Sequence, residues 1–241
     1  MLRYRDRPLD RMQFSGSDFL AQSGIYSAPL RLPLYVPTWT LPDARIKRAV
    51  DVGLALILLS ILTLPMMLIA LAIQLDSPGP ALFRQRRVGL LGREFEMLKF
   101  RTMHHHTSSP DDCRQASRHD PRVTRVGQWL RCLSADELPQ LINVLRGEMS
   151  LVGPRPHAPG TRAGGRLFEE VAPRYADRHR VRPGITGLAQ VRGWRGETDT
   201  EDKLLRRIDS DLEYIATWSL ALDLRIICST VGTVLRMRNA Y

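Results

Sequence analysis

Cysteine is scarce in this chain of 241 residues, and the few cysteines present indicate no site. Cys113, Cys132 and Cys228 form no CxxC pair and no zinc-type spacing, and an odd number of cysteines gives no disulfide framework. We therefore expect reduced thiols, as on the cytoplasmic side of a membrane.

Two nucleotide-binding fingerprints are also missing. The turn-rich segment from Arg182 to Gly193 contains neither GxGxxG nor GxxxxGK[ST], so it supports neither a Rossmann site nor a P-loop. Its Gly184 and Gly187 still allow backbone N–H groups to come close to a phosphate or a base. A signal peptide is not expected either, because roughly the first forty residues are polar.

One long apolar stretch dominates what is present. Residues Ala49 to Leu75 are almost all apolar, the exceptions being Asp51, Ser60, Thr63 and Gln74. At about 1.5 Å per helical residue, this stretch is long enough to cross a hydrocarbon core. A buried core helix of a soluble protein is disfavoured, because the stretch has no polar face.

The interior of this stretch favours a re-entrant hairpin over a simple crossing. Pro65 removes a helical hydrogen bond near the middle, and the hydroxyls of Ser60 and Thr63 are placed to bond the carbonyls that a proline frees. We predict a kinked hairpin that enters one leaflet and returns to the cytoplasm. An ordinary spanning helix is the alternative.

The flanks of the stretch lead to the same prediction. A spanning segment should carry its Lys/Arg excess on one side only, yet basic residues stand on both sides here: Arg45, Lys47 and Arg48 before it, Arg84, Arg86 and Arg87 after it. We expect Lys47 and Arg48 to reach lipid headgroups. Asp51, at the apolar edge, needs a partner, and a neighbouring arginine is the obvious one.

The formal net charge of +10 fits a nucleic acid, an anionic membrane surface or a phosphorylated substrate. The apolar stretch favours the last two partners.

The most chemically distinctive segment runs from Ser134 to Gly147. Its apolar spacing predicts an amphipathic helix, with a capping box of Ser134 and Glu137 at the start and Gly147 as the stop. Asp136 and Glu137 then fall in the first turn, where the helix dipole should keep Asp136 ionised. Such a carboxylate can attack phosphorus or bind Mg²⁺; alternatively, both acids only cap the helix.

Basic residues at fixed positions accompany these acids. A short strand followed by Pro154-Arg155-Pro156 holds Arg155 in a restricted backbone, which suits bidentate phosphate binding, although such turns are often only structural. Residues 81–89 and 94–103 alternate as two short strands joined by a turn, and Lys99 and Arg101 project from the second.

The expected fold is mixed α/β and mostly helical, with a small sheet and no large parallel sheet. A short helix is predicted at 126–133, and amphipathic helices at 203–218 and 220–235. The last of these either lies in the membrane interface or packs onto the core. We divide the chain into a flexible N-terminal extension (1–44), a re-entrant membrane helix (45–76) and a cytoplasmic catalytic domain (77–241).

Several motifs in order resemble the monotopic polyprenyl-phosphate sugar-1-phosphate transferases, which start bacterial exopolysaccharide and O-antigen synthesis; the length is similar to that of the short ExoY-type members. The matching segments are KRAVD, LDSPGPALFRQRRVG, EMLKFRTM, DPRVTRVGQWLR, SADELPQLINVLRGEMSLVGPRP, HRVRPGITGLAQV, RGETDT and DLEYIATWSLALDLRII.

The resemblance implies that Asp136 is the nucleophile and Glu137 its acidic partner, with both as ligands of Mg²⁺ at a diphosphate. It implies that Pro65 corresponds loosely to the family's break in the membrane helix. It also implies that basic residues bind phosphate or nucleotide, and the predicted set is Lys99, Arg101, Arg131, Arg155 and Arg182.

The implied substrates are a UDP-hexose, with glucose or galactose as the sugar, and undecaprenyl phosphate. The implied location is the cytoplasmic face of the bacterial inner membrane, without nucleic acid, and a homo-oligomer is compatible with the sequence. The competing hypotheses are a polybasic membrane adaptor without catalysis and a nucleic-acid-binding protein.

Overall fold

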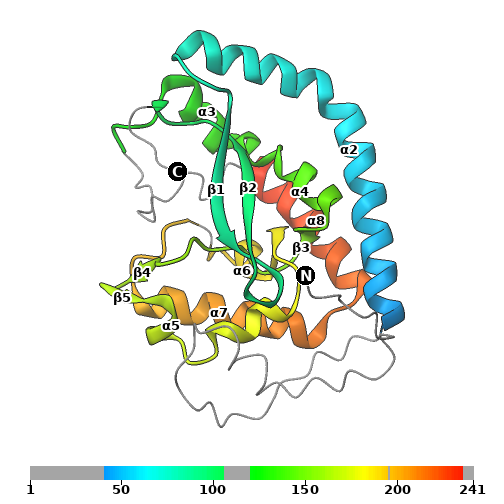
Figure 1. The fold of residues 1–241 in the computed structure, drawn as a ribbon. Helices are drawn as coiled ribbons and strands as arrows, with labels where there is room; N and C mark the ends of the chain where they lie inside the picture. The colour runs from blue at the N-terminus through cyan, green and yellow to red at the C-terminus, as the bar shows by residue number, and fades with distance from the viewer. Residues whose placement is uncertain (1–40, 106–119, 195, 236–241) are drawn as a thin grey trace, which may run out of the picture. The chain divides into compact units, whose positions relative to one another are not determined.

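The computed structural model describes residues 41–105, 120–194 and 196–235 (Figure 1). All described residues belong to one compact unit, Pro37–Tyr241. Most of the expected N-terminal extension, residues 1–40, lies outside the described residues.

The apolar stretch forms one continuous helix, α2 (Leu41–Asp76), which runs through Pro65 and bends along its length (Figure 1). The hydroxyls do not bond the carbonyl of Ile61 that Pro65 leaves free. Ser60 Oγ donates to the carbonyl of Leu56 (2.9 Å) and Thr63 Oγ1 to that of Leu59 (2.6 Å). That prediction was wrong because each hydroxyl bonds the carbonyl of its own preceding turn.

Basic residues at the start of α2 point into the protein and not toward lipid. Lys47 is 7% exposed, and its Nζ lies 2.6 Å from Asp223 Oδ2. The guanidinium of Arg48 donates to the carbonyls of Val144 (2.6 Å) and Leu145 (3.0 Å). The expected headgroup contacts of both residues are therefore wrong, because interior acceptors satisfy these cations.

Asp51 also has a different partner from the one expected. Its Oδ1 accepts a hydrogen bond from the backbone N–H of Leu151 at 3.1 Å, and the charge of Lys47 acts on it as well. A backbone donor of β3 (Ser150–Val152) thus takes the place of the predicted arginine.

The end of α2 packs against the same unit. Ile73 belongs to a buried cluster with Ala81, Phe100 and Leu130. Between the two packed ends, α2 is the one helix in the described part of the chain that is long and apolar enough to cross a membrane, and only 6% of its most apolar window is buried. Its exposed apolar side chains include Leu56, Ile57, Ile61, Leu64, Met67, Leu68, Leu71 and Leu75.

Two antiparallel strands follow, β1 (Leu82–Val88) and β2 (Glu94–Phe100), which confirms the predicted pair. A 3₁₀ helix, η2 (Leu90–Gly92), forms the turn. Asn143 fixes β2 to the next helical segment: its Oδ1 accepts from Leu98 N (2.9 Å) and its Nδ2 donates to the carbonyl of Glu96 (2.7 Å).

The remaining elements confirm a mostly helical fold with small sheets. Among the described residues, β3 pairs in parallel with β6, and β4 pairs antiparallel with β5. One face of α8 packs inward through Ile226 and Asp223, while Leu224 and Val231 stay exposed. The bounds are α3 (Arg125–Leu133), η4 (Ala135–Glu137), α4 (Gln140–Arg146), β4 (Arg162–Ala163), β5 (Arg166–Leu167), α5 (Phe168–Val171), η5 (Tyr175–Arg180), β6 (Gly184–Thr186), α6 (Leu188–Val191), α7 (Glu201–Thr217) and α8 (Leu220–Leu235).

The buried pair at the start of α2 yields a stability prediction. Lys47→Met leaves the Asp223 carboxylate buried beside the Tyr214 hydroxyl without its cation. Removing one partner of a buried ion pair costs about 3–5 kcal/mol. We expect a loss of this size in the free energy of unfolding, measured by urea denaturation in detergent.

The matched control is Arg84→Met, which breaks an exposed pair with Glu96 and should cost about 1 kcal/mol or less. Equal losses in the two variants would contradict the anchoring of α2 by Lys47.

Candidate active site

The two acidic residues lie in a tight turn between two helices. Ser134 ends α3 in the left-handed conformation (φ 56°), and η4 then carries Asp136 and Glu137 toward α4, which ends at Gly147 (φ 82°) as predicted. Ser134 makes no side-chain cap. The predicted capping box is therefore wrong, because the left-handed turn separates Ser134 from α4 and Glu137 bonds elsewhere.

Glu137 is the centre of an ion-pair cluster. Arg155 binds it with two nitrogens, Nη2 to Oε1 at 2.5 Å and Nη1 to Oε2 at 3.3 Å. Lys99 Nζ lies 3.7 Å from Oε1. The structure thus brings together one predicted cation from β2, one from the Pro-Arg-Pro turn after β3, and the acid from η4.

Asp136 is buried next to this cluster but is not ion-paired. It is 9% exposed, and no cation among the described residues lies within ion-pair distance of its carboxylate. The pKa of Asp136 is raised overall, mainly by burial. Glu137 raises it further, while Lys99, Arg131 and Arg155 favour the ionised form.

The surroundings of Lys99 disfavour the charged form of its side chain. Burial lowers the pKa of its ammonium group to about 8, against the opposing effect of Glu137. The nearby charge of Arg155 lowers the pKa further. A bound anion would relieve this effect by supplying negative charge.

Arg87 is a residue of this cluster that the sequence analysis did not single out. Its pKa is lowered to about 10, mainly by burial and then by Arg155, while Glu137 raises it. The strand register pairs Phe83 with Lys99 and Arg87 with Phe95. Because alternate residues of a strand share a face, alternation along β1 was the signal that could have placed Arg87 on the same face of the strand pair as Lys99.

The cations around the two acids outnumber them, which suits the binding of a multiply charged anion. Four basic side chains interact electrostatically with Asp136 or Glu137, namely Arg87, Lys99, Arg131 and Arg155. Arg131 also donates from Nε to Thr102 Oγ1 at 2.9 Å.

Two predicted phosphate-binding residues lie outside this cluster. Arg101 donates to the carbonyls of Ile73 (3.3 Å) and Ser77 (2.7 Å), and so caps the end of α2. Arg182 Nε donates to the carbonyl of Gly147 at 2.8 Å, at the opposite end of α4 from Asp136. Neither placement supports a role in the cluster.

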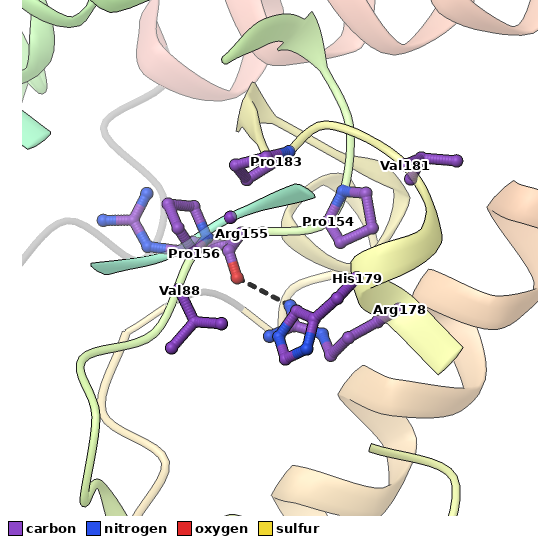
Figure 2. A pocket seen from close by; sticks show the side chains of 9 residues that line it. Val88, Pro154, Arg155, Pro156, Arg178, His179, Val181 and Pro183 are labelled. Atoms are coloured by element: carbon purple, nitrogen blue, oxygen red, sulfur yellow. Dashed lines mark hydrogen bonds between the residues drawn. The ribbon is translucent and has the colours of Figure 1, made fainter. Parts of the chain in front are cut away.

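The backbone of Arg155 faces a separate small pocket of about 10 Å³ (Figure 2). The guanidinium points away from this pocket, while the carbonyl oxygen accepts a hydrogen bond from Arg178 Nη2 at 2.6 Å. Arg155 therefore connects the ion-pair cluster to a second group of buried side chains.

The acids of this cluster suit Mg²⁺ only together with a substrate. The described residues contain no group of three or more potential metal ligands. Mg²⁺ is usually bound through one or two carboxylates and substrate phosphates. Asp136 and Glu137 fit that pattern, with Asp136 as the more available donor because Glu137 is paired with Arg155.

This chain matches known proteins over most of its length. The profile of the family described as "Bacterial sugar transferase" matches residues 42–237. An undecaprenyl-phosphate glucose phosphotransferase of Komagataeibacter xylinus is 57% identical over 81% of this chain and 37% of that protein. A UDP-glucose:undecaprenyl-phosphate glucose-1-phosphate transferase of Caulobacter vibrioides is 54% identical over 81% of this chain and 72% of that protein.

The fraction of a relative's length that this chain covers differs from one relative to another. The exopolysaccharide production protein PSS of Rhizobium leguminosarum bv. phaseoli is 49% identical over 83% of this chain and 100% of that protein. The chain spans little more than a third of the Komagataeibacter relative, so the match concerns one part of that protein.

The depressed pKa of Lys99 predicts a pH-dependent affinity for diphosphates. In the ligand-free protein, Lys99 loses its charge as the pH rises through about 8. We expect pyrophosphate affinity, measured by calorimetry, to fall above that pH in the wild-type protein relative to a Lys99→Arg variant, whose guanidinium stays charged. The ratio of the two affinities cancels the titration of the ligand itself, and a ratio independent of pH would contradict the prediction.

Proposed function

This chain belongs to the bacterial sugar transferase family, and from that premise we propose that it transfers a hexose-1-phosphate from a UDP-hexose to undecaprenyl phosphate. The observation that carries the proposal is the buried Asp136, which has no ion-pair partner among the described residues, beside a Glu137 that Arg155 and Lys99 hold in place. The transfer would start the synthesis of an exopolysaccharide or O-antigen-type glycan.

We propose glucose as the sugar. The matched relatives of Komagataeibacter, Caulobacter and Escherichia coli, at 57%, 54% and 46% identity, carry names that specify glucose. Galactose remains the second sugar to be tested in the same assay.

The cations of the cluster bind the donor. Arg155 and Lys99, with Arg87 beside them, hold the diphosphate, and a planar guanidinium suits two phosphate oxygens at once. Mg²⁺ bound by Asp136, Glu137 and the diphosphate would further neutralise the charge on the leaving UMP.

The reaction proceeds in two displacements at one phosphorus. An Asp136 carboxylate oxygen attacks the β-phosphorus, the bond to the bridging oxygen breaks, and UMP leaves with the electron pair, which gives an aspartyl-phosphosugar. A phosphate oxygen of undecaprenyl phosphate then attacks the same phosphorus and displaces the carboxylate. The product is an undecaprenyl-diphosphate-linked hexose, and Asp136 is restored.

The acceptor reaches the site because α2 enters the membrane from one side. A crossing helix has its ends on opposite faces of the bilayer, whereas both ends of α2 are attached to one compact unit, through Lys47 and Asp223 at the start and Arg101 at the end. We propose that the exposed apolar middle of α2 lies in the cytoplasmic leaflet of the inner membrane as a re-entrant segment. Both ends then face the cytoplasm.

The nucleophile assignment is tested by Asp136→Asn. The amide keeps the shape of the side chain but cannot form the acyl phosphate, so we expect UMP release from UDP-glucose with undecaprenyl phosphate and Mg²⁺ to fall by about four orders of magnitude or more. Membrane association should persist.

The exposed Asp202→Asn serves as the matched control and should keep full activity. Substantial UMP release by Asp136→Asn would remove Asp136 from the mechanism, and a wild-type protein that binds membranes but releases no UMP would favour the adaptor.

The topology is tested with Arg45→Cys and Arg84→Cys, each in a background whose native cysteines are changed to serine. Both positions are exposed; Arg45 lies near the start of α2 and Arg84 lies in β1, beyond its end. An impermeant maleimide should label both in inside-out vesicles and neither in spheroplasts. Labelling of the two positions from opposite faces would restore the spanning helix.

A further inference from the structure

We propose that the buried pair of Arg178 and Asp211 positions Arg155 for donor binding, so that both are positioning residues of the reaction. This inference rests on the transferase function proposed above. It concerns side chains that lie behind the ion-pair cluster and contact it through the backbone of Arg155.

Arg178 forms the direct link. It is 2% exposed, and its Nε and Nη2 both donate to Asp211 Oδ2, at 3.0 and 2.6 Å. The same Nη2 donates to the carbonyl oxygen of Arg155 at 2.6 Å (Figure 2). The carboxylate on α7 thus orients the guanidinium that holds the Arg155 peptide.

A second contact fixes the same loop two residues further along. Arg178 Nη1 lies 2.8 Å from His157 Nδ1, and the Tyr175 hydroxyl lies 3.2 Å from the same nitrogen. Burial and the neighbouring Arg178 and Arg207 keep the pKa of His157 well below its ordinary value, so its neutral ring can accept the shorter hydrogen bond, from Arg178. Arg178 therefore holds the Pro-Arg-Pro turn at a carbonyl and at an imidazole.

The backbone and the side chain of Arg155 explain why the contact at its carbonyl matters for donor binding. Pro154 and Pro156 restrict the backbone around it, so a fixed carbonyl also fixes the direction in which the side chain leaves. The guanidinium must align both nitrogens with Glu137, at 2.5 and 3.3 Å. A displacement of about 1 Å at such a positioned group can cost about 100-fold in rate.

The stability of the fold alone does not account for this arrangement. A buried ion pair often contributes no more stability than apolar residues of similar volume. Here one guanidinium serves a carboxylate, an imidazole and the one backbone carbonyl that belongs to the donor-binding arginine. Apolar residues could fill that space but could not hold that carbonyl.

The test is a double-mutant cycle in the full-length, membrane-embedded protein, with UDP-glucose and undecaprenyl phosphate as substrates. Asp211→Asn should lower kcat/KM for UDP-glucose by about 10- to 100-fold in the wild-type background. Because Asp211 acts through Arg155, the same substitution should change kcat/KM less than about threefold when Arg155→Ala is already present. A purely structural defect would multiply with Arg155→Ala.

Two further variants complete the test. Glu213→Gln, on the same helix but in an exposed pair with Arg192, should keep wild-type activity. Arg178→Lys keeps the buried positive charge but removes the planar guanidinium. It should lower kcat/KM as Asp211→Asn does, and its effect should likewise be non-additive with that of Arg155→Ala. Thermal unfolding reports whether each variant folds.

The outcomes separate the two proposals. A wild-type protein that releases no UMP overturns the transferase function and this inference with it. If the wild-type protein is active but Asp211→Asn or Arg178→Lys leaves kcat/KM unchanged, the positioning role alone is overturned. The same conclusion follows if the loss caused by either variant multiplies with that of Arg155→Ala. Failure of both variants to fold also overturns it, since the pair would then serve the fold.

Discussion

The bidentate contact between the Arg155 guanidinium and the Glu137 carboxylate is the interaction on which the site depends. It joins the turn after β3 to η4, and Lys99 brings β2 to the same carboxylate. Buried charges are tolerated only when they are paired and hydrogen-bonded. Cations outnumber acids in this cluster, so the same charges that lock three segments together also suit the binding of an anion such as the diphosphate that we propose.

The long apolar helix shows that basic residues beside an apolar stretch need not face lipid. Lys47 and Arg101, at the two ends of α2, are both almost fully buried and bind acceptors of the same compact unit. These polar anchors hold the ends of the helix, while most apolar side chains of its middle are exposed in the described part of the chain. The result is a helix whose ends are fixed by hydrogen bonds and whose middle is suited to a hydrocarbon environment.

Local patterns in the sequence predicted local structure well. Alternation gave β1 and β2, helical spacing gave α3, α7 and α8, and Gly147 ended α4 as expected. Long-range partners could not be predicted in this way, because Lys47 and Asp223 are 176 residues apart. Lys99 and Arg101 come from one short motif, yet one joins the ion-pair cluster and the other caps α2, since β2 ends between them.

Two adjacent acids in one turn have different partners, and this difference assigns their roles. Glu137 uses both oxygens on Arg155 and has Lys99 nearby, so its carboxylate orients cations and is poorly placed to move. Asp136 is as deeply buried but has no cation within ion-pair distance among the described residues; Lys99 acts on it at longer range. A nucleophile must be free to form a new bond, and this availability is the reason that we propose Asp136, and not Glu137, as the nucleophile.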